Sequence, residues 1–384
     1  MADIGGKARI LCVLGTRPEA LKLAPVITAL RGTAGLRAIV CLTGQHRELV
    51  DDILPLFGIT PDFDLDLMMP RQSLVDLTAR LLRGLDAVIG RVDPQLVLVQ
   101  GDTTTAMAAG LAALYRQKRL AHIEAGLRTG DLACPWPEEA NRRIIRALAA
   151  IHFAPTETAR RNLLVEGVAS ASIHVTGNTI VDALNAIRAR PGGDARAGTA
   201  RQLPKIARSS RRRLLLVTSH RRESFGSGLA QLCEALAELA RRRDVAILFP
   251  VHPNPHVRAV VHRHLAGRSR IQLVDPLTYP AFVACMSRAD ILLTDSGGVQ
   301  EEAAVLGKPV LVLRRKSERV EGIRNGGAML VGTDAGRIVA AAARLLDDEA
   351  AYGRMSRAES CYGDGGASDR IVAILARALM RAVA

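Results

Sequence analysis

The chain has 384 residues, a length typical of about two domains. Hydrophobic residues make up 48% of it, and 52 Lys and Arg against 38 Asp and Glu give a formal net charge of +14. No apolar run approaches the roughly 18 residues of a membrane span, and the first seven residues lack the apolar stretch of a secretory signal, so we expect a cytoplasmic protein that does not enter a membrane.

Apolar runs of strand length alternate with helical segments through the first half of the chain. The predicted strands are residues 8–14, 37–42, 96–100, 120–123 and 151–154. Helices follow clear start signals, such as Asp102-Thr103-Thr104-Thr105 before an Ala-rich run. Alternation of this kind is typical of parallel βαβ units. We therefore expect residues 1–188 to form one Rossmann-like domain.

The alternation lapses over residues 189–211, where Gly, Pro and Ser indicate an exposed linker. It then resumes, with strands predicted over residues 214–218, 245–250, 271–274, 290–294 and 309–313. Residues 212–366 should form a second Rossmann-like domain, and the segment 367–384 should be a helix that packs against a domain. The expected fold class is α/β, with a cleft between the two domains.

Three carboxylates finish or follow predicted strands of the first domain. Asp102, Glu124 and Glu138 should lie at the same sheet edge, which is where ligands bind in open α/β sheets. Carboxylates grouped in a cleft can have raised pKa values and act as acid and base. Glu139 has a simpler explanation as a negative charge in the first turn of a helix. The group as a whole therefore predicts a site.

A glycine turn joins a strand to a helix in the second domain. Asp295-Ser296-Gly297-Gly298 offers backbone amides at a helix start, which suits a phosphate, and Glu302 lies one turn on, placed to accept hydrogen bonds from a ribose. An ordinary strand–helix turn capped by Ser296 is the alternative. No G-x-G-x-x-G follows the first strand and no Walker P-loop is present, so no nicotinamide cofactor is expected. The turn marks residues 212–366 as the nucleotide-binding domain.

Basic side chains follow the first strand of each domain. Arg17 and Lys22 come after residues 8–14, where either can bind a phosphate. His220, Arg221 and Arg222 come after residues 214–218, where they can neutralise a diphosphate. A solvated loop of charges is the alternative for the second group.

Cysteine spacing and charge clusters indicate no other kind of site. The six cysteines form no C-x-x-C pair and show no His spacing typical of zinc, so no metal is expected. The clusters Arg211-Arg212-Arg213 and Arg241-Arg242-Arg243 each precede a strand, without the interleaved aromatic residues that stack on bases. Nucleic acid is therefore not expected as a partner.

Taken in order, the polar blocks of the chain resemble those of the non-hydrolysing UDP-N-acetylglucosamine 2-epimerases. The resemblance covers essentially the whole chain and depends on the ordered set rather than on any single block. The blocks are Gly15-Thr16-Arg17-Pro18-Glu19-Ala20, Thr43-Gly44-Gln45-His46-Arg47-Glu48, His122-Ile123-Glu124-Ala125-Gly126-Leu127-Arg128-Thr129-Gly130, Phe153-Ala154-Pro155-Thr156-Glu157, Thr176-Gly177-Asn178-Thr179 and Tyr362-Gly363-Asp364-Gly365.

The resemblance implies a GT-B-like fold and reversible C2 epimerisation of UDP-GlcNAc to UDP-ManNAc, with neither metal nor other cofactor. In this family UDP leaves by anti elimination, and it adds back after the C2 proton has been returned on the other face. Carried over by motif, the catalytic residues are Asp102, Glu124, Glu138 and His220, and His220 assists the departing UDP.

The resemblance also assigns binding residues. Those for the UDP-sugar are Arg17, Lys22, Phe282, Ser296, Gly297, Gly298, Glu302 and Arg314, with Phe282 where the family packs the uracil. Bacterial members bind a second UDP-GlcNAc as an activator, and the matching residues are Gln45, His46, Arg71, Gln72, Arg221 and His252. A homodimer is expected on the same basis.

The chain departs from the family pattern after Arg314. The family usually has Asp-Thr-Thr-Glu-Arg-Pro-Glu, and this chain has Arg315-Lys316-Ser317-Glu318-Arg319-Val320-Glu321. Two basic residues replace an acidic and a neutral one, which leaves open a related UDP-2-acetamido sugar such as a uronate. A milder change is Ser219, where the family often has Gly or Ala.

Three other functions stay open at the level of the sequence. A hydrolysing 2-epimerase would release free ManNAc and UDP. A GT-B glycosyltransferase would share the fold and the nucleotide-binding turn, but it would not need three carboxylates in its first domain. A nucleic-acid-binding protein would explain the charge but not the polar blocks at the strand ends.

Overall fold

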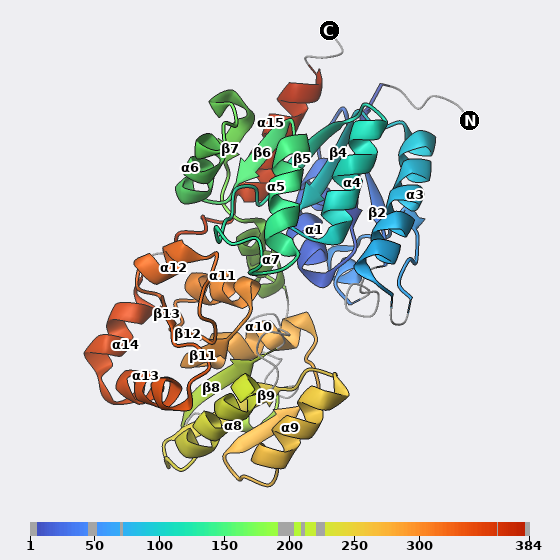
Figure 1. The fold of residues 1–384 in the computed structure, drawn as a ribbon. Helices are drawn as coiled ribbons and strands as arrows, with labels where there is room; N and C mark the ends of the chain where they lie inside the picture. Colours follow the sequence, from blue (N-terminus) through green and yellow to red (C-terminus); the bar gives the residue numbers. More distant parts are fainter. Residues whose placement is uncertain are drawn as a thin grey trace. The chain divides into compact units, whose positions relative to one another are not determined.

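The computed structural model describes residues 6–44, 52–69, 72–190, 203–208, 212–219, 227–358 and 360–380. The chain divides into two compact units, one of residues 1–183 with 362–384 and the other of residues 184–361. Each unit is a parallel sheet with helices packed on it (Figure 1). The predicted linker, residues 189–211, falls largely outside the described residues.

The first unit contains seven parallel strands in the order β3-β2-β1-β4-β5-β6-β7. They are β1 (Ala8–Leu14), β2 (Leu36–Leu42), β3 (Phe63–Asp64), β4 (Leu96–Gln100), β5 (Arg119–Ile123), β6 (Ile151–Ala154) and β7 (Ile173–Val175). The central strand β1 pairs with both β2 and β4, so that Cys12 lies beside Val40 and Leu98. Because helices cover both faces, β1 and β4 are continuous apolar runs rather than alternating ones.

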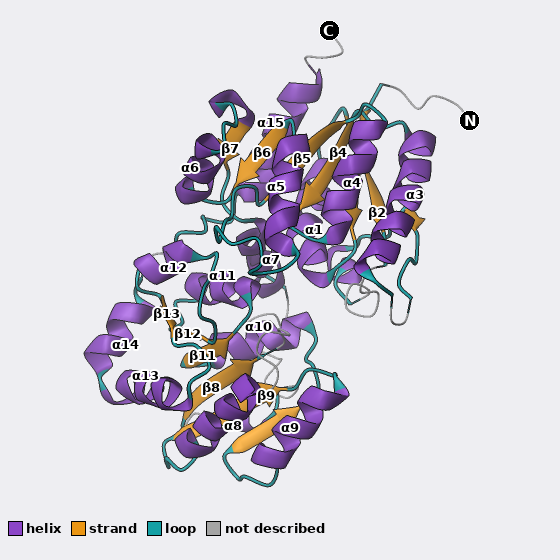
Figure 2. Ribbon diagram, viewed as in Figure 1, coloured by secondary structure: helices purple, strands orange, loops and turns teal. Residues whose placement is uncertain are grey.

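Among the described residues, seven α-helices belong wholly or partly to this unit. They are α1 (Arg17–Arg31), α3 (Leu74–Val92), α4 (Thr104–Tyr115), α5 (Glu138–Leu148), α6 (Glu157–Val165), α7 (Thr179–Arg188) and α15 (Ala367–Met380). Helices α3, α4 and α5 lie side by side (Figure 2), and their apolar side chains form one core with the sheet. On α3 the buried residues recur at helical spacing, as at Leu77, Leu81 and Leu85.

The C-terminal helix α15 packs against α1 of the first unit. Where the chain re-enters this unit, two glycines with positive φ lie against each other: Gly177 at 88° and Gly363 at 108°. A Cβ atom on Gly363 would lie 3.1 Å from the Cα of Gly177. The Asn178 N–H donates to the Tyr362 carbonyl at 2.7 Å. Close approach of the two backbones explains the glycines at this crossing.

The second unit repeats the plan with six parallel strands in the order β10-β9-β8-β11-β12-β13. They are β8 (Arg213–Thr218), β9 (Val245–Pro250), β10 (Ile271–Val274), β11 (Ile291–Thr294), β12 (Val310–Val312) and β13 (Ala328–Leu330). Its helices are α8 (Ser227–Leu239), α9 (Pro255–Leu265), α10 (Tyr279–Arg288), α11 (Gly297–Val305), α12 (Val320–Arg324), α13 (Ala335–Asp347) and α14 (Glu349–Ser356). Both strand orders are those of doubly wound Rossmann-like sheets, which confirms the predicted fold class.

All ten predicted strands are present, each within one residue of its predicted ends. Strands β3, β7 and β13 were not predicted from the sequence. These strands have only two or three residues and lie at sheet edges, so they carry too little periodicity to be recognised. In the part of the chain that the structure describes, no helix is long and apolar enough to cross a membrane.

Candidate functional site

The carboxyl ends of β1, β4 and β5 carry the predicted residues of the first unit. These strands are neighbours, and the strand order reverses between β1 and β4; ligands bind at such a point in open α/β sheets. Arg17 opens the helix after β1, Asp102 follows β4, and Glu124 follows β5. Glu138 is the first residue of α5. The topology thus brings these four residues to one edge of the sheet.

Glu124 is a buried carboxylate held by two donors. The Lys22 ammonium and the Gln100 side-chain amide both donate to its Oε2 atom, and all three side chains are buried. Glu124 also has a left-handed backbone, with φ of 65°. Such a conformation is unfavourable for a residue with a Cβ, and it is found preferentially at functional sites. Lys22, predicted to bind phosphate, here forms an ion pair with Glu124.

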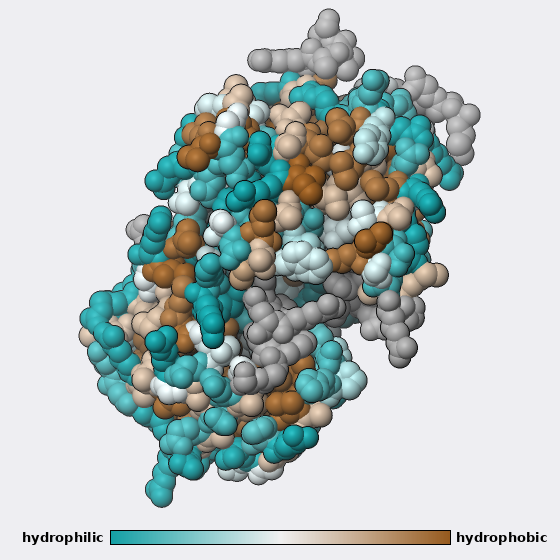
Figure 3. Space-filling view, in the orientation of Figure 1, coloured by the Kyte–Doolittle hydropathy of each residue, from teal (hydrophilic) through white to brown (hydrophobic). Residues whose placement is uncertain are grey.

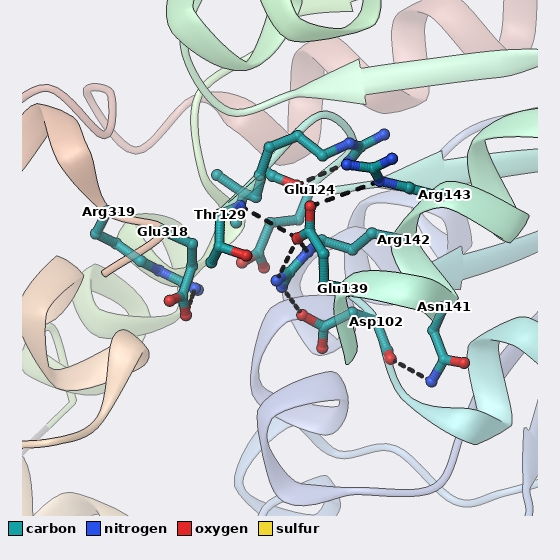
Figure 4. Close-up of polar contacts among 12 residues, drawn as sticks. Asp102, Glu124, Thr129, Glu139, Asn141, Arg142, Arg143, Glu318 and Arg319 are labelled. Atoms are coloured by element: carbon teal, nitrogen blue, oxygen red, sulfur yellow. Dashed lines mark hydrogen bonds and ion pairs between the residues drawn. The ribbon is translucent and has the colours of Figure 1, made fainter. Parts of the chain in front are cut away.

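Two residues of α5 hold Asp102 in place. The Arg142 guanidinium is 2% exposed and lies between two carboxylates (Figure 4): it contacts Asp102 Oδ2 through one terminal nitrogen, and it donates from Nε to Glu139 Oε2 at 3.0 Å. The Asn141 amide donates to the Asp102 carbonyl at 2.9 Å. Main chain and side chain of Asp102 are therefore both held by neighbours on one helix.

Glu139 is more than a negative charge at a helix start. Its side chain is fully buried, and it accepts hydrogen bonds from the backbone N–H groups of Thr129 at 3.2 Å and Gly130 at 3.3 Å. It also forms an ion pair with Arg142. Glu139 therefore joins the turn after β5 to α5 and orients the guanidinium that faces Asp102.

Glu19 is a second fully buried carboxylate, and it joins two strand ends. Its Oε2 atom accepts from the N–H groups of Gly15 at 3.0 Å and Thr16 at 2.7 Å. Its Oε1 atom accepts from the Thr103 hydroxyl at 2.6 Å. Burial raises the pKa of Glu19 to about 7, although the hydrogen bonds from these donors act to lower it.

In the second unit, hydroxyl groups connect the turn that is predicted to bind a nucleotide, residues 295–298, to the neighbouring strand end. The side-chain oxygens of Thr218 and Thr294 are 2.6 Å apart, and the Ser296 N–H donates to Thr294 Oγ1 at 3.0 Å. The Ser219 hydroxyl donates to the buried Asp295 carboxylate at 3.1 Å. Ser219, one of the positions where this chain differs from the family pattern, thus joins the end of β8 to the turn after β11.

A buried cluster of charges lies against this turn. The Arg319 guanidinium donates to Glu301 Oε1 at 3.0 Å and pairs with Glu318, which also accepts from Arg314 at 2.8 Å. A Cβ atom at Gly297 would lie 2.8 Å from Arg319 Cζ. A side chain at position 297 would therefore require the guanidinium to shift away from the turn.

The other predicted nucleotide residues lie on α10 and α11. Glu302 is buried and accepts from the Tyr279 hydroxyl at 2.8 Å. Phe282, on α10, is partly buried. A Cβ atom at Gly298 would meet open space, so packing within the protein does not require glycine at this position. The missing side chain leaves room for a ligand to approach the backbone.

Comparisons with known proteins by sequence and by structure identify the family of this chain. A family model described as UDP-N-acetylglucosamine 2-epimerase matches residues 28–376. The chain belongs to this family. The UDP-N-acetylglucosamine 2-epimerase of Escherichia coli strain K12 is 50% identical to it over 370 residues, which cover 96% of this chain and 98% of the relative. The family predicted from the polar blocks is therefore confirmed.

Two further members show how completely the 2-epimerase family matches this chain. A probable UDP-N-acetylglucosamine 2-epimerase of Ralstonia nicotianae is 52% identical over 366 residues, covering 94% of this chain and 97% of the relative. The crystal structure of UDP-GlcNAc 2-epimerase from Neisseria meningitidis bound to UDP-GlcNAc is 41% identical, with a TM-score of 0.91, and the match covers 96% of this chain and 100% of that one.

The loop that departs from the 2-epimerase pattern contains both exposed and buried residues. Arg315 and Lys316 are exposed, whereas Ser317, Glu318 and Arg319 are buried. The buried residues, of which Glu318 and Arg319 match the family, form the charge cluster against the turn.

The predicted activator residues are described only in part. Gln45, His46, Arg71 and Arg221 lie outside the described residues, as does the predicted catalytic residue His220. Gln72 is partly buried, and its Oε1 atom accepts from the Met69 N–H at 3.2 Å and from Arg80. His252 is partly buried, and its Nδ1 atom accepts from the Asn254 N–H at 3.2 Å.

Sequence reasoning overlooked several side chains that hold these residues. They are Glu19, Asn141 and Arg142 in the first unit and Glu301 and Arg319 in the second. The spacing Thr16-x-x-Glu19 is that of a capping box, which the structure contains, and this local signal predicts that the Glu19 side chain accepts from the Thr16 N–H. The others contact residues distant in sequence or stand beside residues that drew attention, so no local pattern marks them.

Members of the two arginine clusters noted in the sequence form ion pairs with Asp side chains. Arg242 pairs with Asp244 at 2.8 Å and with Asp347 at 2.6 Å, and Arg213 pairs with Asp290 at 2.9 Å. Among the described residues, no group of three or more His, Cys, Asp and Glu side chains lies close enough to hold a metal ion.

Proposed function

We propose that the protein interconverts UDP-GlcNAc and UDP-ManNAc by reversible, non-hydrolysing epimerisation at C2. The observation that carries this proposal is the set of carboxylates at one sheet edge in a chain of the 2-epimerase family. Asp102 is oriented by Arg142, Glu124 is oriented by Lys22 and Gln100, and Glu138 begins the neighbouring helix. Positioned carboxylates of this kind serve proton transfer.

The proposed reaction proceeds by elimination and re-addition. A base removes the C2 proton, the C2–H electrons form a C1–C2 double bond, and the C1–O bond to UDP breaks. An acid then returns a proton to C2 on the other face, and UDP adds back at C1. Asp102, Glu124 and Glu138 supply the base and the acid. His220, assigned from the family pattern, assists the departure of UDP.

The nucleotide is proposed to bind at the turn before α11. Backbone amides at a helix N-terminus favour phosphate oxygens, and the open space at Gly298 lets a ligand approach the backbone. The buried Glu302, oriented by Tyr279, accepts from the ribose hydroxyls. Phe282 packs against the uracil. Arg17, Lys22, Ser296, Gly297 and Arg314 are the remaining proposed ligands.

Incubation with UDP-GlcNAc in D2O tests the reaction. We expect UDP-ManNAc to form, with deuterium at C2 of both sugars, because the base exchanges its proton with solvent before the return step. Free ManNAc and UDP would instead identify a hydrolysing 2-epimerase. Transfer of the sugar to an added acceptor would identify a glycosyltransferase. NMR of the sugar ring distinguishes these three products.

A UDP-2-acetamido uronate is the second candidate substrate, and the charges of Arg315 and Lys316 favour it. Both side chains are exposed and stand outside the buried cluster. We therefore expect the double change Arg315→Asp, Lys316→Thr to alter kcat/KM for UDP-GlcNAc by no more than about twofold, and to change the stability of the fold by no more than about 0.5 kcal/mol. A strong preference for the uronate that the double change abolishes would identify the uronate as the substrate.

A homodimer is proposed to form through α4 and α5. Leu114 and Tyr115 on α4 and Ile144 on α5 are large apolar side chains that are 52%, 72% and 40% exposed. In the space-filling view of this face, apolar residues gather over these helices (Figure 3). Exposed apolar patches mark association surfaces. We expect light scattering to give twice the chain mass, and we expect Tyr115→Lys with Ile144→Glu to give the mass of one chain.

A second UDP-GlcNAc is proposed as an activator, on the family pattern. Gln45, His46, Arg71, Gln72, Arg221 and His252 would bind it. An activator of this kind makes the rate rise cooperatively with UDP-GlcNAc concentration, whereas a single site gives a hyperbola.

A further inference from the structure

Three successive residues around Asp102 are each hydrogen-bonded to a buried side chain from a different element. The Gly101 carbonyl bonds with His122 Nε2, from β5, at 2.7 Å. The Asp102 carbonyl accepts from Asn141, from α5, at 2.9 Å. The Thr103 hydroxyl donates to Glu19, from α1, at 2.6 Å. None of these three contacts involves the Asp102 carboxylate.

The three side chains are among the most buried polar groups of the first unit. Glu19 is 0%, His122 is 1% and Asn141 is 5% exposed. A buried polar side chain that keeps its hydrogen bond away from water holds its partner in a defined place, because breaking the bond leaves an unsatisfied group. Glu19 further accepts from the N–H groups of Gly15 and Thr16, so it joins the turn before Arg17 to the loop of Asp102.

We propose that Glu19, His122 and Asn141 are positioning residues that fix the main chain on both sides of Asp102. They act through Asp102 and make no contact with the reacting atoms. The chemistry of this proposal rests on the proposed function, in which Asp102 is one of the proton-transfer groups. Small displacements of such a group lower the rate steeply, since proton transfer requires the two atoms within hydrogen-bond reach.

The protonation states agree with these contacts. The Gly101 carbonyl only accepts, so His122 must carry its proton on Nε2. Burial lowers the pKa of His122 to about 3, which keeps the ring neutral. Above pH 7 Glu19 is ionised and accepts from all of its donors. Assays at pH 8 therefore examine the fully bonded arrangement.

Substitutions at Thr103 isolate the Glu19 contact. Thr103→Val removes the hydroxyl that donates to Glu19 and also caps α4 by accepting from Ala106. Thr103→Ser keeps both bonds. Thr156→Val is the matched control, because Thr156 caps α6 in the same way, accepting from Ala159 at 3.1 Å.

We expect Thr103→Val to lower kcat by about tenfold or more, with KM changed by no more than about twofold. Thr103→Ser should restore kcat. Thr156→Val should lower the melting temperature through the loss of its helix cap while leaving kcat unchanged. Asn141→Ala should act like Thr103→Val, since it frees the Asp102 carbonyl. Equal kcat in Thr103→Val, Asn141→Ala and the wild type would overturn the proposal.

A double-variant cycle shows whether the effect passes through Asp102. On the Asp102→Asn background, Thr103→Val should cost less than about twofold in the rate of C2 deuterium exchange, because the positioned carboxylate is already absent. A further loss as large as that in the wild-type background would mean that Thr103 acts independently of Asp102, and it would overturn the proposal.

Amide hydrogen exchange tests the positioning without any substrate. Thr103→Val and Asn141→Ala should speed exchange in the peptide covering residues 101–107, and Thr156→Val should leave that peptide unchanged. Unchanged exchange in both variants would overturn the proposal whatever the enzyme does. If the wild-type protein does not epimerise UDP-GlcNAc but the two variants still show faster exchange, the proposed function is wrong. The positioning role of the three side chains would then remain.

Discussion

Replacing Asp102 by Asn, Glu124 by Gln or Glu138 by Gln is expected to lower kcat by about 10²–10⁴-fold in each case, the usual contribution of a positioned acid or base. Each change keeps the shape of the side chain and removes its ability to take or give a proton at C2. The neighbours that orient these groups, such as Arg142 and Lys22, stay in place. The measurement is kcat for UDP-GlcNAc together with deuterium incorporation at C2.

Glu166→Gln is the matched control for these variants. Glu166 is a partly buried carboxylate that accepts two hydrogen bonds from Arg128, at 2.7 and 2.8 Å. It has no assigned role at the sheet edge, so its amide variant should keep a kcat close to that of the wild type. Circular dichroism and melting temperature establish that each variant is folded. Near-normal turnover in all three folded active-site variants would contradict the proposed acid–base group.

Glu139→Gln is expected to lower the free energy of unfolding by about 3–5 kcal/mol, the range found when a buried ion pair loses one partner. Glu139 and Arg142 are 0% and 2% exposed, so the guanidinium would keep its charge in a buried place with one carboxylate fewer. The backbone donors of Thr129 and Gly130 would also face an amide in place of a carboxylate. Urea unfolding of the two proteins measures the difference.

Glu157→Gln provides the comparison for an exposed pair. Glu157 pairs with Arg160 at 2.7 Å, with 58% of its side chain exposed, and exposed pairs of this kind contribute about 0–1 kcal/mol. The combined change Glu139→Gln, Arg142→Met should cost less stability than the sum of the two single changes, since the two side chains contact each other. If Glu139→Gln cost no more than Glu157→Gln, the buried ion pair would not stabilise the first unit.

Local patterns along the chain were sufficient for the sheets and for the place of the candidate site. Continuous apolar runs such as Leu96–Gln100 and Ile291–Thr294 are strands because both of their faces are buried. Polar residues that follow such runs meet at one edge, since parallel strands end on the same side. The sequence alone therefore places Asp102, Glu124 and the turn at Ser296 at strand ends.

The short edge strands could not be predicted in this way. Ile173–Val175 pairs with β6 and Ala328–Leu330 pairs with β12, each at the edge of its sheet. Three residues carry no reliable periodicity of their own. Their strand conformation follows from the backbone groups that the adjacent strand leaves open for pairing.

The sequence by itself determined the order of strands and helices, the family and the residue types at each strand end, because these depend on local periodicity and on ordered motifs. Only the tertiary structure decided which charges meet. Lys22 and Glu124 are 102 positions apart, and Glu19 and Thr103 are 84 apart. No spacing rule connects residues at such distances. Their contact follows from the order of β1, β4 and β5 in the sheet, and burial then makes each contact specific, because an unpaired charge in that place is unfavourable.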